Sequence, residues 1–231
     1  MKNFGSPATL AGLLSFNGGF VDTAGFLGLQ GLFTAHVTGN FVTLGAALVE
    51  GSHGILGKLI ALPEFVLVIA LARLAGTALR QRGAPALPIL LSVKVLLLAA
   101  FFVLAVAFGP FANADSPLAL LTGFAGIAAM ALQNAVHRVH LPDQPPSTLM
   151  TGSTTQATID AVDLALGGAA TNIAATRARL HRLIFSILCF AGGCASSALL
   201  YWLAGFWCLA VPVVVGAMAA MVHVKAGPAA V

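Results

Sequence analysis

The chain has 231 residues, of which 59% are hydrophobic and 8% are charged, and its formal net charge is +4. A soluble domain is typically about 25% charged, so this composition excludes a soluble domain of useful size and predicts a polytopic, all-α membrane protein. Most Lys and Arg residues lie between apolar segments, where they orient a protein in the membrane. We therefore interpret the net charge as a topology signal and expect no nucleic-acid partner.

Eight apolar segments follow one another along the chain, and about 20 residues suffice to cross a hydrocarbon core of about 30 Å. The first contains Asn17 and Asp22 and lacks a small-residue cleavage motif, so we expect a retained span there and not a cleaved signal peptide. Three cysteines in the late segments are expected to be small core residues. The segments are expected at residues 7–30, 32–50, 59–79, 87–108, 117–136, 148–166, 183–203 and 206–223.

Two of these segments, 32–50 and 148–166, are too polar to be convincing spans. If all eight cross and the N-terminus is cytoplasmic, six basic loop residues lie inside and three outside. If these two do not fully cross, eight lie inside and one outside, which the positive-inside rule favours. We therefore predict a bundle of six full transmembrane spans plus two broken or partly inserted helices, with both termini cytoplasmic. Eight spans are the alternative.

The two halves of the chain repeat one another. Thr38–Asn40 aligns with Thr151–Ser153 at an offset of 113, and after a two-residue shift Asp22 aligns with Gln133. Three full spans in each half would make the second half inverted, as in many secondary transporters, whose site lies at the repeat interface. Eight spans would make the repeats parallel. The single membrane domain, 1–231, would then contain repeats at 7–109 and 117–224.

Polar residues in segment 32–50 recur at helical spacing and predict one polar stripe. The stripe consists of His36, Asn40, Thr43, Ala47 and Glu50, and its counterpart in the second half consists of Ser153, Gln156, Asp160 and Asp163. Two such stripes cannot both face lipid, so we expect them to face each other or a water-filled cavity. The alternative is hydrogen bonding between helices.

Asp22 is the strongest single candidate for function, and it follows Gly18 and Gly19, where a helix could be distorted. A carboxylate at membrane depth needs a proton or a partner. Arg73 and Lys94 lie at a shared depth in neighbouring segments, so we predict a charge-balanced cavity that they form with Asp22. Alternatively, both cations extend towards the membrane interface.

Other classes of chemistry are disfavoured. His137, His140 and Asp143 lie in or beside a Pro-rich loop without further ligands, so no metal site and no cofactor are expected. The chain contains no P-loop, HExxH motif or nucleophile elbow, so we expect neither an ATP-driven pump nor an enzyme.

The pieces GFVDTAGFL, GLFTAHVTGNFVTLGAAL, GIAAMALQNAV and TLMTGSTTQATIDAVDL resemble the YoaK family of bacterial membrane proteins over nearly the whole chain. The resemblance implies a multi-pass inner-membrane protein and names no activity. Its motif residues here are Gly19, Asp22, Thr38, Gly39, Asn40, Gln133, Asn134, Thr151 and Gly152.

These patterns predict a small secondary transporter or permease for an unidentified small molecule or ion, embedded in the lipid bilayer and working as a monomer or a homodimer. The alternative is a non-transporting membrane assembly or sensory protein. The expected path residues are Asp22, His36, Thr38, Asn40, Thr43, Gln133, Asn134, Thr151, Gln156 and Asp160, with Arg73 and Lys94 for charge balance and Gly18, Gly19, Gly39 and Gly152 for backbone packing.

Overall fold

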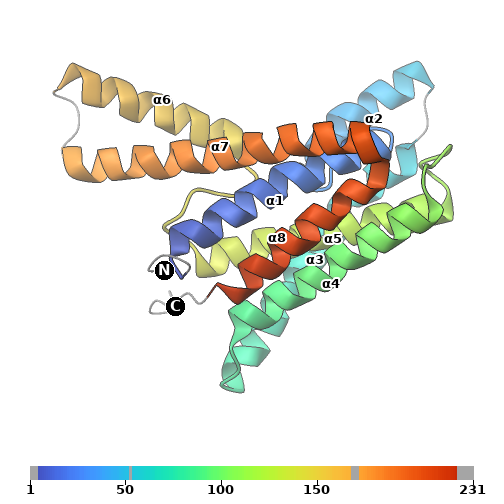
Figure 1. Cartoon of the computed structure of the whole chain (residues 1–231), viewed down its shortest axis with the longest axis horizontal. Coiled ribbons are helices and arrows are strands. Elements are labelled where there is room, and N and C mark those ends of the chain that lie inside the picture. Colours follow the sequence, from blue (N-terminus) through green and yellow to red (C-terminus); the bar gives the residue numbers. More distant parts are fainter. Residues whose placement is uncertain (1–4, 52–53, 168–171, 223–231) are drawn as a thin grey trace.

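The computed structural model describes residues 5–51, 54–167 and 172–222, and within these ranges every regular element is a helix. The helices are α1 (Pro7–Gly28), α2 (Gly39–Glu50), α3 (Ile55–Gln81), α4 (Ala86–Phe108), α5 (Pro117–His140), α6 (Met150–Leu166), α7 (Ile173–Ala204) and α8 (Ala210–Met221), with a 3-10 turn, η1 (Gly205–Leu209), between the last two (Figure 1).

Four helical stretches in the described ranges are long and apolar enough to cross a membrane: α3, α4, α5 and the continuous stretch from α7 to α8. Helices α2 and α6 have only 12 and 17 residues, fewer than the roughly 20 that a crossing helix needs. The prediction of an all-helical fold is confirmed in the described ranges, and the four apolar stretches support a membrane protein.

Two predicted boundaries were wrong. Residues 29–38 are not helical, so α2 begins at Gly39 and not at residue 32. Helix α7 begins at Ile173 and not at residue 183, so the arginines expected in a linker lie within its first turns. Asn172 explains the earlier start, because its side chain accepts a hydrogen bond from Ala175 N and caps the helix.

Helix α3 begins where a distant carboxylate satisfies its free amides. No side chain of its own caps it, but Asp115, in the turn between α4 and α5, accepts hydrogen bonds from Gly54 N at 3.0 Å, Ile55 N at 3.2 Å and Leu56 N at 2.9 Å. A negative charge at a helix N-terminus is favourable on both hydrogen-bonding and dipole grounds. Asp115 therefore ties two turns together at one end of the bundle.

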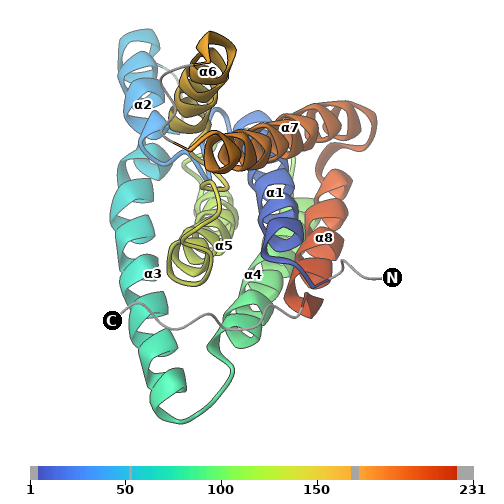
Figure 2. The same cartoon turned by 90° about the vertical axis from the view of Figure 1, so that its left-hand side faces the viewer.

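The bundle consists of two helix groups that share a central contact. Helix α5 lies between α3 and α4, while α1 packs against α7 and α8, and α4 contacts α8 (Figure 2). Helix α2 packs on α3 and α6 packs on α7, and these two hairpins project from opposite ends of the bundle (Figure 1). Between them, α2 and α6 make no contact in the described ranges.

Two buried apolar clusters form the core, one at each end of these central helices. The first cluster includes Phe20, Leu98 and Met130, and the second includes Leu14, Leu91 and Val136. Each of α1, α3, α4 and α5 contributes buried residues to both clusters, so the level between the clusters crosses these four helices.

Candidate functional site

Residues 29–38, the α1–α2 loop, interrupt the helical chain inside an otherwise apolar bundle. Gln30 and Gly31 adopt positive φ angles of 51° and 83°, and the Gln30 side chain donates to the carbonyls of Phe111 and Ala112. Backbone groups outside a helix need other hydrogen-bond partners when water is excluded. The polar residues near this loop supply those partners.

Asp22 of α1 binds the α1–α2 loop through both carboxylate oxygens. Its Oδ1 accepts from Ala35 N at 2.7 Å and His36 N at 3.3 Å, and from the Thr34 hydroxyl at 3.5 Å. Its Oδ2 lies 2.6 Å from His36 Nδ1. The His36 ring also packs edge-on against Phe190 of α7. The partner of Asp22 is therefore the loop that follows its own helix.

Asn40 closes the same loop from the first turn of α2. Its Oδ1 accepts from Phe33 N at 2.8 Å and its Nδ2 donates to Phe33 O at 2.9 Å, and the side chain is buried. Asp22, His36 and Asn40, three of the predicted path residues, are thus all part of the hydrogen bonding of this loop. The expected helical stripe is wrong at its first member, because His36 precedes α2 and lies in the loop.

The second half contains a similar arrangement on α5. Gln133 Nε2 donates to Ser147 Oγ at 3.1 Å, and Asn134 Oδ1 accepts from Thr148 Oγ1 at 2.7 Å. Both pairs are 14 residues apart, the same separation as Asp22 and His36. In both halves, a polar residue of the helix binds the irregular segment that follows it.

The predicted charge balance between Asp22, Arg73 and Lys94 is not formed. Asp22 makes its ion pair with His36, whereas Arg73 is exposed on α3 and pairs with none of the described acidic residues. Lys94 is fully buried, and its Nζ has no hydrogen-bond partner in the described ranges. For Arg73, the alternative that it extends towards the interface fits its exposure.

The predicted cavity between the two polar stripes is also absent from the described residues, because α2 and α6 do not meet. Asp160 of α6 instead binds Arg179 of α7, with Arg179 Nε and Nη2 donating at 2.8 and 2.7 Å. Gln156 donates to the same carboxylate at 2.8 Å. Two of the three expected path residues on α6, Gln156 and Asp160, therefore hold a helix hairpin together.

The remaining predicted residues divide between close packing and exposure. A Cβ on Gly18 would lie 2.8 Å from Ser147 O, and a Cβ on Gly39 would lie 3.0 Å from the Phe33 ring. Thr43 is half-buried and donates to Asn40 O. Three other residues are exposed, and these are Thr38, Thr151 and Gly152. A Cβ on Gly152 would touch nothing, so no close approach requires that glycine.

A layer of buried polar residues separates the two apolar clusters, and the sequence prediction did not assemble it. Asn17 lies between the Leu14 and Phe20 levels of α1, Lys94 between Leu91 and Leu98 of α4, and Gln133 between Met130 and Val136 of α5. All three are fully buried. We call Asn17, Lys94 and Gln133 the polar layer.

Two members of the polar layer, Asn17 and Gln133, donate hydrogen bonds to the backbone of neighbouring helices. Asn17 Nδ2 donates to Pro212 O of α8 at 3.1 Å, and Gln133 Nε2 donates to Leu14 O of α1 at 2.8 Å. Three polar atoms of the layer have no partner in the described ranges: Asn17 Oδ1, Lys94 Nζ and Gln133 Oε1. One donor group and two acceptors are thus free at the centre of the bundle. Helical periodicity could not predict this layer, because periodicity groups residues on the face of one helix and the members of the layer come from three different helices.

The described residues contain no cluster of three or more side chains suited to a metal ion. Comparison with known proteins gives one match, to the family described as "Protein of unknown function (DUF1275)", over residues 10–222. The chain belongs to this family. The match covers every described helix of the bundle in whole or in large part, so the family signature extends over the polar layer and both loops. No curated protein and no solved structure matches the chain.

Proposed function

We propose that this DUF1275 member is a small secondary transporter or permease whose path passes through the polar layer. The unpartnered atoms of Asn17, Lys94 and Gln133 carry the proposal. Polar groups buried without a partner usually mark an unobserved water or ion, and an ionisable residue within the membrane is costly enough to indicate function. The free donor and the two free acceptors suit a hydrated ion or a small polar molecule.

The proposal includes two inverted repeats, and the helix contacts support them. Exchanging α1 with α5, α3 with α7 and α4 with α8 turns α1–α7 into α5–α3 and α1–α8 into α5–α4, and all four of these contacts are observed. The smaller α3–α4 contact has no α7–α8 counterpart, because α7 and α8 each contact η1 instead. In Figure 1, each exchanged pair of helices runs in opposite directions. The polar layer lies at the interface of the proposed repeats, where inverted-repeat transporters bind their cargo.

The proposal also includes six membrane-crossing helices, α1, α3, α4, α5, α7 and α8. In Figure 1 these helices run along the bundle, α2 projects beyond one end of it, and α6 projects beyond the other end together with the first part of α7. This topology brings Arg80, Arg82 and Arg138 to the end opposite Lys58, in agreement with the positive-inside rule. Lys2 and Lys225 lie outside the described residues. Cytoplasmic termini and residence in the bacterial inner membrane follow as parts of this proposal, as the YoaK resemblance implies.

Within this proposal, the α1–α2 loop is the movable part of the path. Discontinuous helices are common in secondary transporters because their free backbone groups can bind cargo and rearrange. The contact between Asp22 and His36 holds this loop to α1, so breaking that contact would release the loop. The proposed transport requires neither an enzymatic activity nor a cofactor. A homodimer remains a prediction.

Uptake into proteoliposomes tests the proposal. Purified protein is reconstituted, a pH gradient is imposed, and uptake of labelled amino acids, organic acids and nucleosides is measured. We expect saturable uptake of at least one compound by the wild type. Lys94→Met and Asp22→Asn should each reduce it at least tenfold. Ser92→Ala is the matched control on α4, because Ser92 is exposed and bonds only its own helix.

Two outcomes contradict the proposal. Unchanged uptake by the Lys94→Met and Asp22→Asn proteins would remove the polar layer and the loop from the path. No uptake of any compound by folded wild-type protein would favour the alternative, a non-transporting assembly or sensory protein. The close contact between helices α1 and α7 and the separation of α2 from α6 are the observations that suit that alternative.

A further inference from the structure

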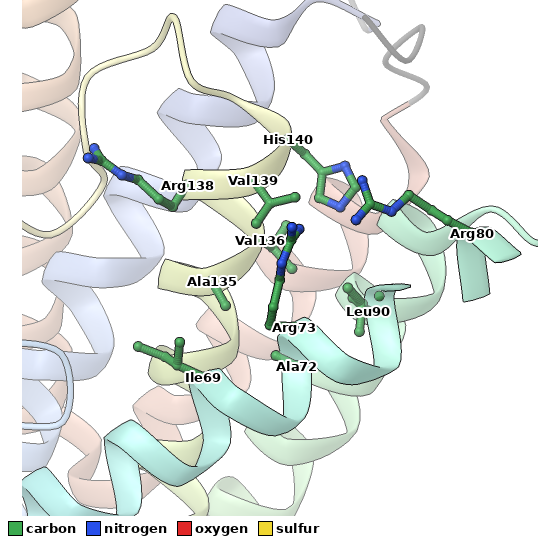
Figure 3. A pocket seen from close by; sticks show the side chains of 11 residues that line it. Ile69, Ala72, Arg73, Arg80, Leu90, Ala135, Val136, Arg138, Val139 and His140 are labelled. Atoms are coloured by element: carbon green, nitrogen blue, oxygen red, sulfur yellow. The ribbon is translucent and has the colours of Figure 1, made fainter. Parts of the chain in front are cut away.

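A basic crevice lies between α3 and α5, away from the polar layer. Its volume is about 150 Å³, and Figure 3 shows the side chains that line it. The guanidinium groups of Arg73 and Arg80 and the ring of His140 lie at one edge of the crevice and point towards one another, whereas Arg138 extends away from them (Figure 3). The floor is apolar and consists of Ile69, Ala72, Gly76, Leu90, Ala135, Val136 and Val139.

The basic edge lacks an internal counter-ion. Among the described residues, neither Arg73 nor Arg80 forms an ion pair, and both are exposed. Asp143, the acidic residue nearest to His140 along the chain, is exposed and forms no ion pair either. Two guanidinium groups that converge without a carboxylate form a site for a phosphate-type anion, which arginine binds through paired N–H donors.

The crevice spans the depth from headgroup to acyl chain. Arg80 lies in the last turn of α3 and His140 is the last residue of α5, so the basic edge is at the ends of the helices. Ile69 precedes Arg80 by three helical turns, about 16 Å along the axis. The apolar floor therefore extends from the basic edge towards the middle of the bundle.

The size of the crevice selects among possible occupants. Sites for drug-sized ligands are typically about 300–1,000 Å³, whereas about 150 Å³ accommodates one benzene-sized apolar group. A whole soluble metabolite does not fit below the arginines, but a short stretch of an acyl chain does, with the remainder in the bilayer. Basic pockets between membrane helices are a known type of site for anionic lipid headgroups.

We propose that this crevice binds an anionic phospholipid, with the phosphate on Arg73, Arg80 and His140 and one acyl chain against the apolar floor. The lipid neutralises the converging guanidinium groups and fills the gap between α3 and α5. The site is independent of the proposed transport path, so its test measures binding and does not require flux.

Native mass spectrometry of the full chain in detergent tests this site with phosphatidylglycerol and phosphatidylcholine as probes. The wild type should retain one phosphatidylglycerol molecule and release phosphatidylcholine. The double variant Arg73→Gln/Arg80→Gln should bind phosphatidylglycerol about 25-fold more weakly, because each basic residue near an anionic lipid contributes about fivefold in affinity. Arg177→Gln is the control, since Arg177 is an exposed arginine on α7 that should not affect binding.

A second variant and a second probe separate a lipid from a free anion. Gly76→Leu fills the floor, where an added Cβ would lie 3.5 Å from Leu90 Cδ1, and leaves both arginines in place. It should reduce phosphatidylglycerol binding while the protein keeps its thermal stability. Inorganic phosphate should not displace the bound lipid. Equal retention of both lipids, undiminished binding by the double variant, or displacement by inorganic phosphate would overturn the proposal.

Discussion

At the residue scale, three short polar side chains in this protein satisfy backbone groups at helix ends and in a loop. Asp22 and Asn40 bind the α1–α2 loop, and Asp115 binds the first amides of α3. In each case a short polar side chain makes the hydrogen bonds that the backbone would otherwise make with water. Lys94 differs from these residues, because no described group partners its ammonium nitrogen.

Asp160 leads to a pH-dependent prediction for α6, a helix that is not among the span candidates. The hydrogen bonds from Arg179 hold the pKa of this carboxyl below its usual value. A depressed folded-state pKa contributes stability above the unfolded pKa of about 3.9, and this contribution is lost as the pH falls through that value towards the folded one. We therefore expect α6 to detach from α7 in acid below about pH 4 and to stay docked at pH 5–8.

Hydrogen exchange of the α6 amides, corrected for the intrinsic pH dependence of exchange, measures this detachment. Asp160→Asn should exchange faster already at pH 7 and should lose the acid transition. Asp163→Asn is the control, because Asp163 lies one turn further along α6 and makes no ion pair within the described ranges. An acid transition of unchanged size in Asp160→Asn would exclude the Arg179 pair as its cause.

At the element scale, small residues determine how closely α1 and α7 approach. Ser15 and Ser186 share a hydrogen bond of 2.9 Å between the two helices. A Cβ on Gly19 would lie 2.2 Å from Phe190 O, and a Cβ on Gly193 would lie 2.1 Å from Phe16 O. Backbone contact of this kind is the usual way in which membrane helices associate without a hydrophobic driving force.

Alanine substitutions in these glycines should separate the helices. We expect Gly19→Ala and Gly193→Ala each to destabilise the protein by about 1–3 kcal/mol, the typical cost of overpacking, because the obstructing atoms belong to backbone. Gly192→Ala is the matched control, since a Cβ there meets nothing within 4 Å. Thermal unfolding in detergent compares the three. Equal melting temperatures for Gly192→Ala and Gly193→Ala would contradict the observed packing.

At the scale of the whole molecule, the turns at the two ends of the bundle distinguish six crossings from eight. With a cytoplasmic N-terminus, six crossings bring the α3–α4 and α5–α6 connections inside and the α4–α5 turn outside, and eight crossings reverse all three. With six crossings, the polar α2–α3 and α6–α7 hairpins lie at opposite membrane surfaces, in agreement with their projection from opposite ends in Figure 1.

Single cysteines in a background without Cys189, Cys194 and Cys208 test this arrangement in intact bacteria. A membrane-impermeant maleimide should label Ala112→Cys in the α4–α5 turn and should not label Gln81→Cys or Asp143→Cys until the cells are opened. All three positions are exposed. Labelling of residues 81 and 143 but not 112 in intact cells would establish the eight-crossing alternative instead.

Composition and local pattern by themselves determined the membrane class, the helical content and most of the helix positions. Long apolar segments must form helices in a bilayer, where each backbone group needs an internal partner. The grouping of Asp22 with His36 and Asn40 was also accessible from sequence, because these residues lie close together along the chain. The polar character of α6 could also be predicted from the sequence, but the partner of Asp160 could not.

Only the tertiary structure decided which side chains meet across helices. Lys94 and Arg73 were placed at a shared depth and were expected to balance the charge of Asp22, but Asp22 binds nearer partners in the loop that follows its own helix. The polar layer joins Asn17, Lys94 and Gln133, which are far apart in sequence, and the basic crevice joins Arg73 with His140 in the same way. Residue spacing specifies the face of one helix, whereas the rotation and pairing of several helices depend on close packing that no single segment encodes.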